Sequence, residues 1–216
     1  MIHRLKLVDT LVTKEKNTKL HPEILTILFE NRRYIKNIFL DIHGLYEISH
    51  IGMTIITPFY EMVSFSSSPN IEYNLIQQNL WKDDSCFSPW MPNKDNFSWW
   101  DDHKITGDFE KVEKIKLKNN MFSFGMTICK QVNDFSLLYS YATRATRDDL
   151  REYYASHLLG LVDIGDYFYK SLRDIYASYD IKCTPPELNH LNSKMYATTI
   201  RPHLTLIRSR SRAIKG

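Results

Sequence analysis

The sequence predicts an α/β protein of the α+β kind, a three-layer α-β-α sandwich with a central, mainly antiparallel sheet and helices on both faces. Its β-rich runs come in two pairs, each joined by a short turn, which favours antiparallel neighbours. Amphipathic helical patterns precede, separate and follow these pairs, so helices are available for both faces of the sheet. The 216 residues, 43% hydrophobic and 25% charged, have the composition of an ordinary globular domain.

The first predicted element is an amphipathic helix that begins at His21 and ends at Gly44. Its apolar residues recur at the spacing of one helical face: Ile24, Leu28, Ile35, Ile38, Phe39 and Ile42. A β-hairpin follows, with strands at 51–57 and 59–66 divided by Pro58.

Two further helices are predicted on either side of an irregular segment. The first opens at Pro69 and Asn70. The second begins at Gly107 and ends at Asn119 and Asn120, which suit a C-cap.

A second strand pair and one long helix complete the predicted fold. Residues 121–132 and 135–143 flank an Asn-Asp dipeptide, which favours a turn. Thr146, with Asp149 three residues later, is typical of a capping box. The helix that follows carries an apolar stripe: Leu150, Tyr154, Leu158, Leu161, Phe168, Leu172, Ile175 and Tyr179.

The irregular segment, residues 79–102, is the most unusual part of the sequence, and we call it the tryptophan-rich segment. It reads NLWKDDSCFSPWMPNKDNFSWWDD and contains all four tryptophans of the chain. Pro89 and Pro92 exclude one continuous helix or a central strand here. Surface loops usually consist of small and polar residues. This density of aromatic side chains therefore predicts a packed segment that forms the wall of a core or cavity, and not a surface loop.

Signatures of catalysis and metal binding are missing from the sequence. There is no glycine-rich phosphate loop, no HExxH and no GxSxG. The eight histidines are scattered, and the three cysteines form no CxxC pair. His157, on the apolar stripe, is interpreted as a satisfied core or interface histidine. We therefore predict no enzyme, no catalytic residue, no metal and no cofactor.

The two ends of the chain differ in charge. Residues 188–216 contain six lysines and arginines and no acid, so the rest of the chain is mildly acidic. We predict a folded domain at 1–184 and a basic tail or linker at 185–216. Such a tail is either a solvated end or a contact for nucleic acid or an anionic membrane. No apolar run reaches about 20 residues and no signal peptide is legible, which predicts a cytoplasmic protein without a membrane span.

Several short stretches, in this order, carry a resemblance to a known family: SSSPNIEY at 66–73, then LWKDDS, FSWWDD, FGMTI and FSLLYSYAT. Asp84 and Trp99 lie fifteen residues apart, and Gly125 lies in the first strand of the second pair. Over residues 25–180 this arrangement resembles the autoinducer-binding domain of LuxR-type quorum-sensing regulators. The resemblance implies a ligand-sensing domain for a small acylated signal molecule, similar to an acyl-homoserine lactone, that serves transcription regulation.

The resemblance also implies a set of ligand-binding residues. The tryptophan-rich segment would cross one face of the sheet, and the rings of Trp81, Phe87 and Trp99 would line a dry cavity, with Trp100 turned away. Asp84 would accept a hydrogen bond from a ligand amide. Tyr73 would donate to a ligand carbonyl, and Ser140 would hold a ligand oxygen or a water.

Some of these residues have structural alternatives. Asp84 would otherwise cap a short helix or pair with Lys82 or an arginine. Trp81 suits plain core equally well, and Gly125 is interpreted as a close approach of the backbone to the tryptophan-rich segment.

The sequence departs from the family at two places. Ser85 follows Asp84 where the family has proline, and Tyr73 has no tryptophan four residues on. The chain would then bind a molecule other than an acyl-homoserine lactone, or none. A helix-turn-helix domain normally follows, but no such pattern is legible in the last 36 residues. We therefore expect either a truncated chain or a single-domain variant, which reaches DNA only weakly or through a missing domain.

Partners follow from the same comparison. The Leu- and Tyr-rich final helix would serve a homodimer or a heterodimer with a LuxR-type protein. The alternative function is a ligand-free interaction protein that pairs with full-length regulators and modulates them.

Overall fold

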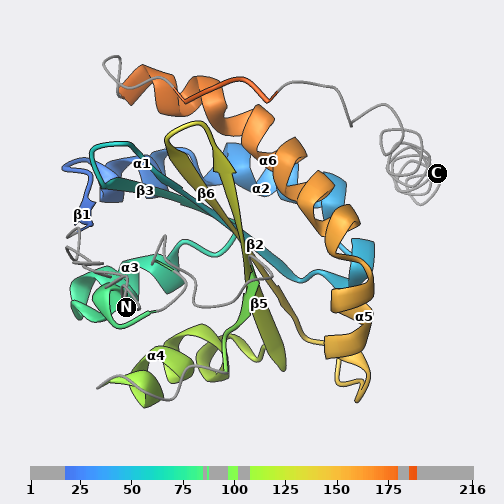
Figure 1. Ribbon diagram of the computed structural model, residues 1–216. Helices are drawn as coiled ribbons and strands as arrows, with labels where there is room; N and C mark the ends of the chain where they lie inside the picture. Colours follow the sequence, from blue (N-terminus) through green and yellow to red (C-terminus); the bar gives the residue numbers. More distant parts are fainter. Residues whose placement is uncertain (1–17, 85–86, 88–96, 102–107, 180–184, 189–216) are drawn as a thin grey trace, which may run out of the picture.

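A computed structural model describes residues 18–84, 87, 97–101, 108–179 and 185–188 (Figure 1). In these ranges six strands form one sheet in the order β1-β3-β2-β6-β5-β4. Every pair of neighbours is antiparallel except β1 with β3, which is parallel. The predicted α-β-α sandwich with a mainly antiparallel sheet is confirmed.

The elements follow the predicted order. The first half contains β1 (Lys19–Leu20), α1 (Ile24–Glu30), α2 (Arg32–Ile42), η1 (Leu45–Glu47), β2 (His50–Ile56), β3 (Glu61–Ser66), α3 (Asn70–Gln77) and η2 (Leu80–Lys82). The second half contains β4 (Phe97–Trp99), α4 (Phe109–Lys116), η4 (Lys118–Asn120), β5 (Phe124–Val132), β6 (Phe135–Thr143), α5 (Leu150–Ser156) and α6 (Leu158–Tyr179).

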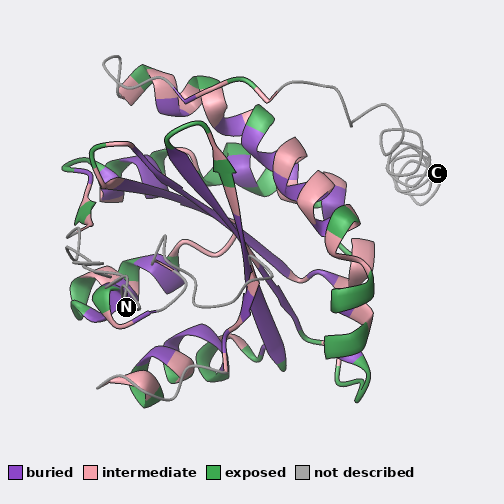
Figure 2. Cartoon of the chain, viewed as in Figure 1, coloured by how far each residue is buried: buried purple, intermediate pink, exposed green. Residues whose placement is uncertain are grey.

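Each face of the sheet is covered by its own set of helices. Figure 1 shows α2, α5 and α6 over one face and α3 and α4 over the other. The central strands are buried along most of their length (Figure 2), because both of their faces are covered. Successive residues of a strand point to opposite faces, so one strand supplies both layers.

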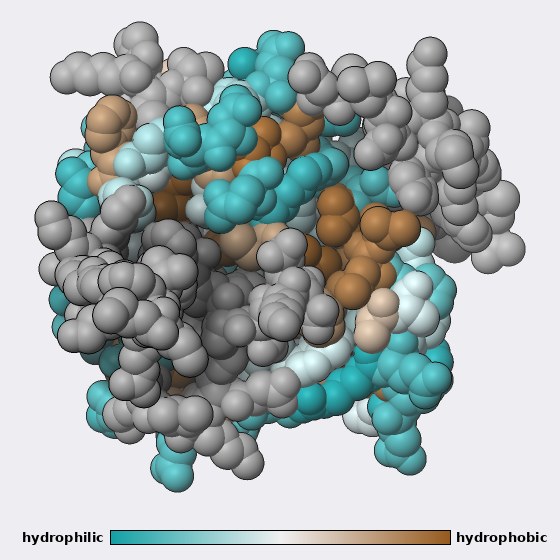
Figure 3. Space-filling model, in the orientation of Figure 1, coloured by the Kyte–Doolittle hydropathy of each residue, from teal (hydrophilic) through white to brown (hydrophobic). Residues whose placement is uncertain are grey.

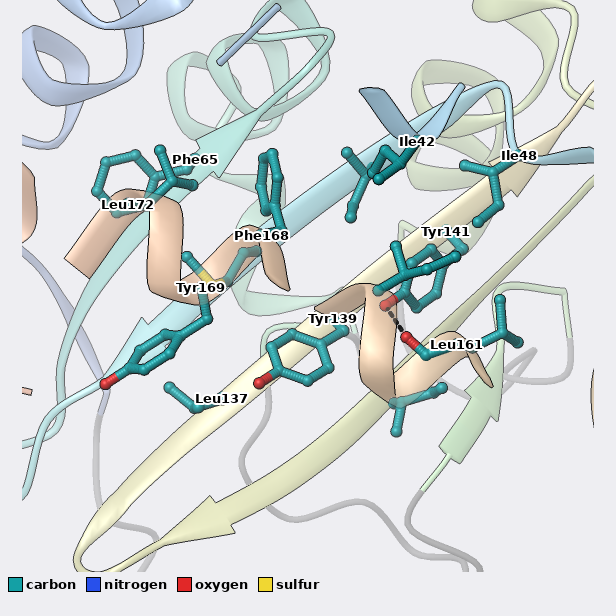
Figure 4. Close-up of a cluster of buried hydrophobic side chains, with 14 of the residues drawn as sticks. Ile42, Ile48, Phe65, Leu137, Tyr139, Tyr141, Leu161, Phe168, Tyr169 and Leu172 are labelled. Carbon is teal, nitrogen blue, oxygen red and sulfur yellow. Dashed lines mark hydrogen bonds between the residues drawn. The ribbon is translucent and has the colours of Figure 1, made fainter. Parts of the chain in front are cut away.

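The larger core lies beneath α2 and α6 (Figure 4). Tyr139 and Tyr141 of β6 are fully buried there, and each hydroxyl has a partner on α6. The Tyr141 hydroxyl donates to the Leu161 carbonyl oxygen at 2.6 Å, and the Tyr139 hydroxyl to Asp166 at 2.8 Å. These bonds satisfy the polar ends of rings whose burial is otherwise a hydrophobic gain.

Two predicted helices are each divided in the structure. The first breaks at Asn31, whose side-chain Nδ2 donates to the Ile27 carbonyl oxygen and so competes with the next helical bond. The last breaks at His157 between α5 and α6, and the ring of His157 packs on Tyr153. His157 is half-buried and contacts Tyr153 through its ring and its Nδ1, so it has partners, as the interpretation of a satisfied core or interface histidine expected, but it is not part of the buried core.

Two predicted helix ends differ from the observed ones. The capping box at Thr146 is wrong: α5 begins after Asp149, whose side chain makes no capping bond and pairs with Arg147. The C-cap predicted at Asn119 and Asn120 is also wrong: α4 ends at Lys116 with Leu117 as its C-cap, although the Asn120 side chain does donate to the Ile115 carbonyl oxygen at 2.7 Å.

The apolar stripe of α6 faces the sheet and not the outside. Leu161, Phe168 and Leu172 are fully buried in the larger core. The stripe therefore packs on the sheet of its own chain, and the expected dimer contact through the final helix, which would have to use its other sides, stays a prediction. Residues 185–188 also contact α6, where the Tyr169 hydroxyl donates to the Pro186 carbonyl oxygen. Most of the predicted tail lies outside the described residues.

Among the described residues, no helix has the length and apolar character needed to cross a membrane. The space-filling view shows a mainly hydrophilic described surface with smaller hydrophobic patches (Figure 3).

Candidate functional site

The sheet face beneath α3 and α4 carries an unbroken row of small side chains. Direct cross-strand pairs join Ser66 to Gly52, Gly52 to Ser140, Ser140 to Thr127, and Thr127 to Ser98. This row, called the small-residue row below, crosses five strands from β3 to β4. The opposite face has Ile, Phe, Met and Tyr at comparable positions. Small residues on only one face leave space there.

Side chains from the covering elements close over this row. They and the row enclose a cavity of about 20 Å³, enough for one water molecule or two. Its lining consists of His50, Gly52, Met53, Thr54, Ile71, Glu72, Leu75, Asp84, Phe87, Trp100, Lys116 and Ser140. Two acidic side chains, Glu72 and Asp84, and one basic side chain, Lys116, therefore meet between the sheet and the helices α3 and α4.

Asp84 and Lys116 form a buried ion pair in the cavity wall. The Lys116 ammonium donates to both carboxylate oxygens of Asp84, at 3.0 and 2.9 Å. The side chains are only 6% and 3% exposed for Lys116 and Asp84. The same ammonium lies 4.0 Å from the ring centroid of Trp100. Two full charges are thus held away from water by each other and by one aromatic face.

Glu72 has no comparable partner. It is 7% exposed, and its Oε2 atom has no hydrogen-bond partner among the described residues. Burial raises the pKa of Glu72 to about 7, against smaller opposing effects of Ser66 and Lys116. This carboxyl group is therefore partly protonated near neutral pH.

His50 is the fourth ionisable group of the site. Its Nδ1 lies 3.1 Å from the Ser67 hydroxyl oxygen, and its ring packs near Trp100 and Phe122. Burial, with a smaller effect of the Lys116 charge, lowers the pKa of His50 to about 3. His50 is therefore neutral in the folded protein and presents a hydrogen-bonding ring without a charge.

Trp100 is fixed against the small-residue row. Its Nε1 donates to the Thr127 hydroxyl oxygen at 2.9 Å, and Thr127 also contacts Ser140 at 2.9 Å. The ring lies on Gly125, where an added Cβ would be 2.2 Å from a Trp100 ring carbon. The interpretation of Gly125 as a close approach to the tryptophan-rich segment is confirmed.

Replacing Gly125 by alanine is expected to destabilise the protein by about 1–3 kcal/mol, because Trp100 must leave its position. Gly52→Ala is the matched control, since its added Cβ would meet its neighbours at 3.4 Å or more. Urea unfolding measures both variants, and tryptophan fluorescence reports the displaced ring. Equal stability of the two variants would contradict this packing.

Three of the six residues predicted to bind a ligand line the cavity: Asp84, Phe87 and Ser140. Trp81 is buried in the smaller core beside α3 and α4, but outside the cavity lining. Tyr73 is 38% exposed and packs edge-on against Phe29.

The predicted orientations of the two adjacent tryptophans are wrong. Trp99 pairs with Met126 of β5 and packs against Phe124 on the side of the larger core. Trp100 follows it in the chain and turns to the cavity. Because β4 is a strand here, neighbouring residues take opposite faces, and the choice depends on a register that the sequence did not reveal.

The sequence interpretation missed Glu72, Lys116 and His50. Lys116 stands seven residues after Phe109 and four after Val112, a position on the apolar side of that helix. Glu72 likewise precedes Leu75 by three. A charge at a core position of a helix is the signal that would have found both.

The described residues contain no group of three or more His, Cys, Asp or Glu side chains placed to hold a metal ion. Lys116 is an ion-pair partner of Asp84, where one alternative expected Lys82 or an arginine.

Comparisons with known proteins find similarity to solved structures, among them two of SdiA. No protein-family model matches this sequence, and no curated protein matches it. A crystal structure of Escherichia coli SdiA is similar with a TM-score of 0.45 and 13% identity, over 73% of this chain and 72% of that one. SdiA in complex with octanoyl-rac-glycerol has a TM-score of 0.48 and 13% identity, over 86% of this chain and 79% of that one. Values this low do not establish a family or a function.

Proposed function

We propose that this chain is a small-molecule sensor domain of the LuxR type, which binds an acylated signal in the cavity between the sheet and α3–α4. The role is binding and not catalysis. The observation that carries the proposal is the convergence of Glu72, Asp84 and Lys116, all buried, on the small-residue row.

A purely structural layer would not need this arrangement. Buried polar and charged groups cost free energy unless each has a partner, and an apolar layer of the same volume is often as stable or more so. The opposite face of the same sheet is filled with large apolar side chains. Among the described residues the buried Glu, Asp and Lys side chains all lie on the cavity face, and such a concentration is typical of a site that recognises a ligand.

The cavity must enlarge to admit an acyl chain. Phe87 and Leu75 contribute apolar surface to its wall, whereas Ser140 and Thr54 contribute hydroxyl groups to its floor. This division suits an amphiphile, whose chain packs on the covering elements and whose polar head lies on the sheet. The sequence resemblance supports the same class of ligand.

The expected result with the right ligand is a higher melting temperature. A ligand at one hundred times its Kd adds about 2.7 kcal/mol to the free energy of unfolding, or roughly 5–10 °C for a domain of this size. Octanoyl-homoserine lactone and octanoyl-glycerol are suitable probes for a thermal-shift scan, together with a series of acyl chain lengths.

Gly52→Leu is expected to abolish that shift, because the new side chain fills the cavity over the small-residue row. Ser136→Leu is the matched control: Ser136 is buried on β6 but does not line the cavity. Comparing each variant with and without ligand removes differences in basal stability. A ligand shift that survives in Gly52→Leu would place binding elsewhere.

The competing function, a ligand-free protein that pairs with LuxR-type regulators and modulates them, makes the opposite prediction. No acylated compound would shift the melting temperature, and mass spectra of the purified protein would show no bound small molecule. Association with a full-length regulator would then be the property to measure.

A further inference from the structure

We infer that Glu72 contacts the ligand, and that the site selects head groups ending in a hydrogen-bond donor, a hydroxyl or an ammonium, over head groups with acceptors alone. This inference rests on the proposed function and names the chemistry that the site recognises.

The geometry places one carboxylate oxygen of Glu72 at the cavity without a partner. Glu72 belongs to α3 and reaches down to the row, where its Oε1 lies 3.4 Å from the position of a Cβ on Gly52. The Ser66 hydroxyl supports the carboxyl group, but Oε2 accepts no bond from any described residue. A buried acceptor of this kind is costly to leave unsatisfied, so a donor that reaches it gains more than an ordinary hydrogen bond.

The other charged groups of the site are already matched to each other. Lys116 gives two hydrogen bonds to Asp84 and lies over Trp100. His50, from β2, is neutral. With Asp84 and Lys116 compensating each other, an ionised Glu72 leaves the cavity with one net negative charge.

A ligand donor is therefore the missing complement. A hydroxyl would satisfy Oε2, and an ammonium would in addition balance the charge. Above pH 7, where Glu72 is mainly ionised, an ether or ester oxygen at the same place would face the carboxylate with lone pairs and be repelled, so the probes below are compared at pH 8. This preference is independent of the acyl chain, which packs elsewhere in the cavity.

Three probes with one acyl chain separate these possibilities. Octanoyl-glycerol carries two hydroxyl donors, its 2,3-di-O-methyl analogue carries none, and N-octanoyl-ethylenediamine carries an ammonium. We expect the full chain to bind one or both donor probes about tenfold to a hundredfold more tightly than the dimethyl analogue. Whether the hydroxyl or the ammonium binds more tightly identifies the natural head group. Isothermal titration calorimetry gives each Kd.

Two Glu72 variants test the residue itself. Glu72→Leu removes the acceptor, and the preference for donor probes should fall to about onefold. Glu72→Gln keeps one acceptor oxygen without charge and should retain part of the preference for hydroxyl while losing that for ammonium. Glu110→Gln, on the exposed side of α4, is the control and should leave every Kd unchanged. Glu72→Leu removes a buried polar group and Glu72→Gln replaces it with an uncharged one of nearly the same size, so both variants are expected to fold.

The possible outcomes distinguish a failure of the Glu72 inference from a failure of the proposed sensor function. Tight binding of all three probes, or a donor preference that survives in Glu72→Leu, overturns the role of Glu72 but leaves the sensor function standing. Failure of all three probes to bind the unaltered chain overturns both.

Discussion

Lys116→Met is expected to lower the free energy of unfolding by about 3–5 kcal/mol, the largest effect of any single change proposed for this protein. Asp84 would remain in the cavity wall with its carboxylate 3% exposed and its bidentate partner removed. The interaction of the ammonium with the Trp100 ring would be lost as well. Urea unfolding of the two proteins at the same pH measures the difference.

Two further variants test whether the loss of stability in Lys116→Met comes from the buried Asp84 charge that has lost its Lys116 partner. In the double variant Asp84→Leu/Lys116→Met both charges are gone, and most of the stability should return. Lys118→Met breaks an exposed pair with Glu113, 3.2 Å apart, and should cost less than about 1 kcal/mol. If Lys116→Met were as mild as Lys118→Met, the buried pair would not exist as described.

Glu72 and His50 are expected to give the stability of the protein an unusual dependence on pH. The pKa of Glu72 is about 7 in the folded protein, above its ordinary 4.5, so the folded state binds the extra proton between these values. Its contribution is fully present below pH 4.5 and is lost as the pH rises through 7, a change of about 3 kcal/mol. His50 acts in the opposite direction.

The pKa of His50 falls from 6.5 to about 3 on folding. Below pH 6.5 His50 binds a proton in the unfolded chain but not in the folded chain. The free energy of unfolding therefore falls by up to about 1.4 kcal/mol per pH unit down to pH 3. Between pH 4.5 and 6.5 the contributions of these two groups oppose each other and nearly cancel. Below pH 4.5 the contribution of His50, alone of the two, continues to lower the stability.

The variant Glu72→Gln separates the two contributions. Relative to the unaltered chain it should be about 3 kcal/mol more favourable at pH 8 than at pH 4.5, because only the unaltered chain loses its buried proton in that interval. Urea unfolding at a series of pH values gives this difference directly. A difference that does not change with pH would show that Glu72 titrates at its ordinary value.

The fold was largely predictable from the sequence because its information is local. Paired β-rich runs with turn residues between them predicted the hairpins β2–β3 and β5–β6, and the apolar periodicity predicted the helices. The breaks at Asn31 and His157 were not predictable, because the apolar pattern continues across them. They depend on a side-chain bond in one case and on ring packing in the other.

The candidate site was only half predictable, because its residues meet through pairings that no local pattern encodes. Asp84 and Ser140 were predicted from the family resemblance, which rests on matches at single positions. The partner of Asp84, Lys116, lies on another helix 32 residues away. The predicted faces of Trp99 and Trp100 are the reverse of the observed ones, because a shift of one residue in strand register moves a side chain to the other face of the sheet. The sequence alone also does not show that the apolar stripe of α6 packs against the sheet of the same chain.

The small-residue row has a geometric consequence for anything that lies on it. Its five positions run across the strands and not along them, so they repeat at the distance between neighbouring strands, about 4.8 Å. Four such steps, from Ser66 to Ser98, give a track roughly 19 Å long. Hydroxyl oxygens stand at every step except Gly52, but only Gly52 and Ser140 line the cavity, because Trp100 is bonded to Thr127 at the next step. The part of the track next to the cavity is therefore a single inter-strand step.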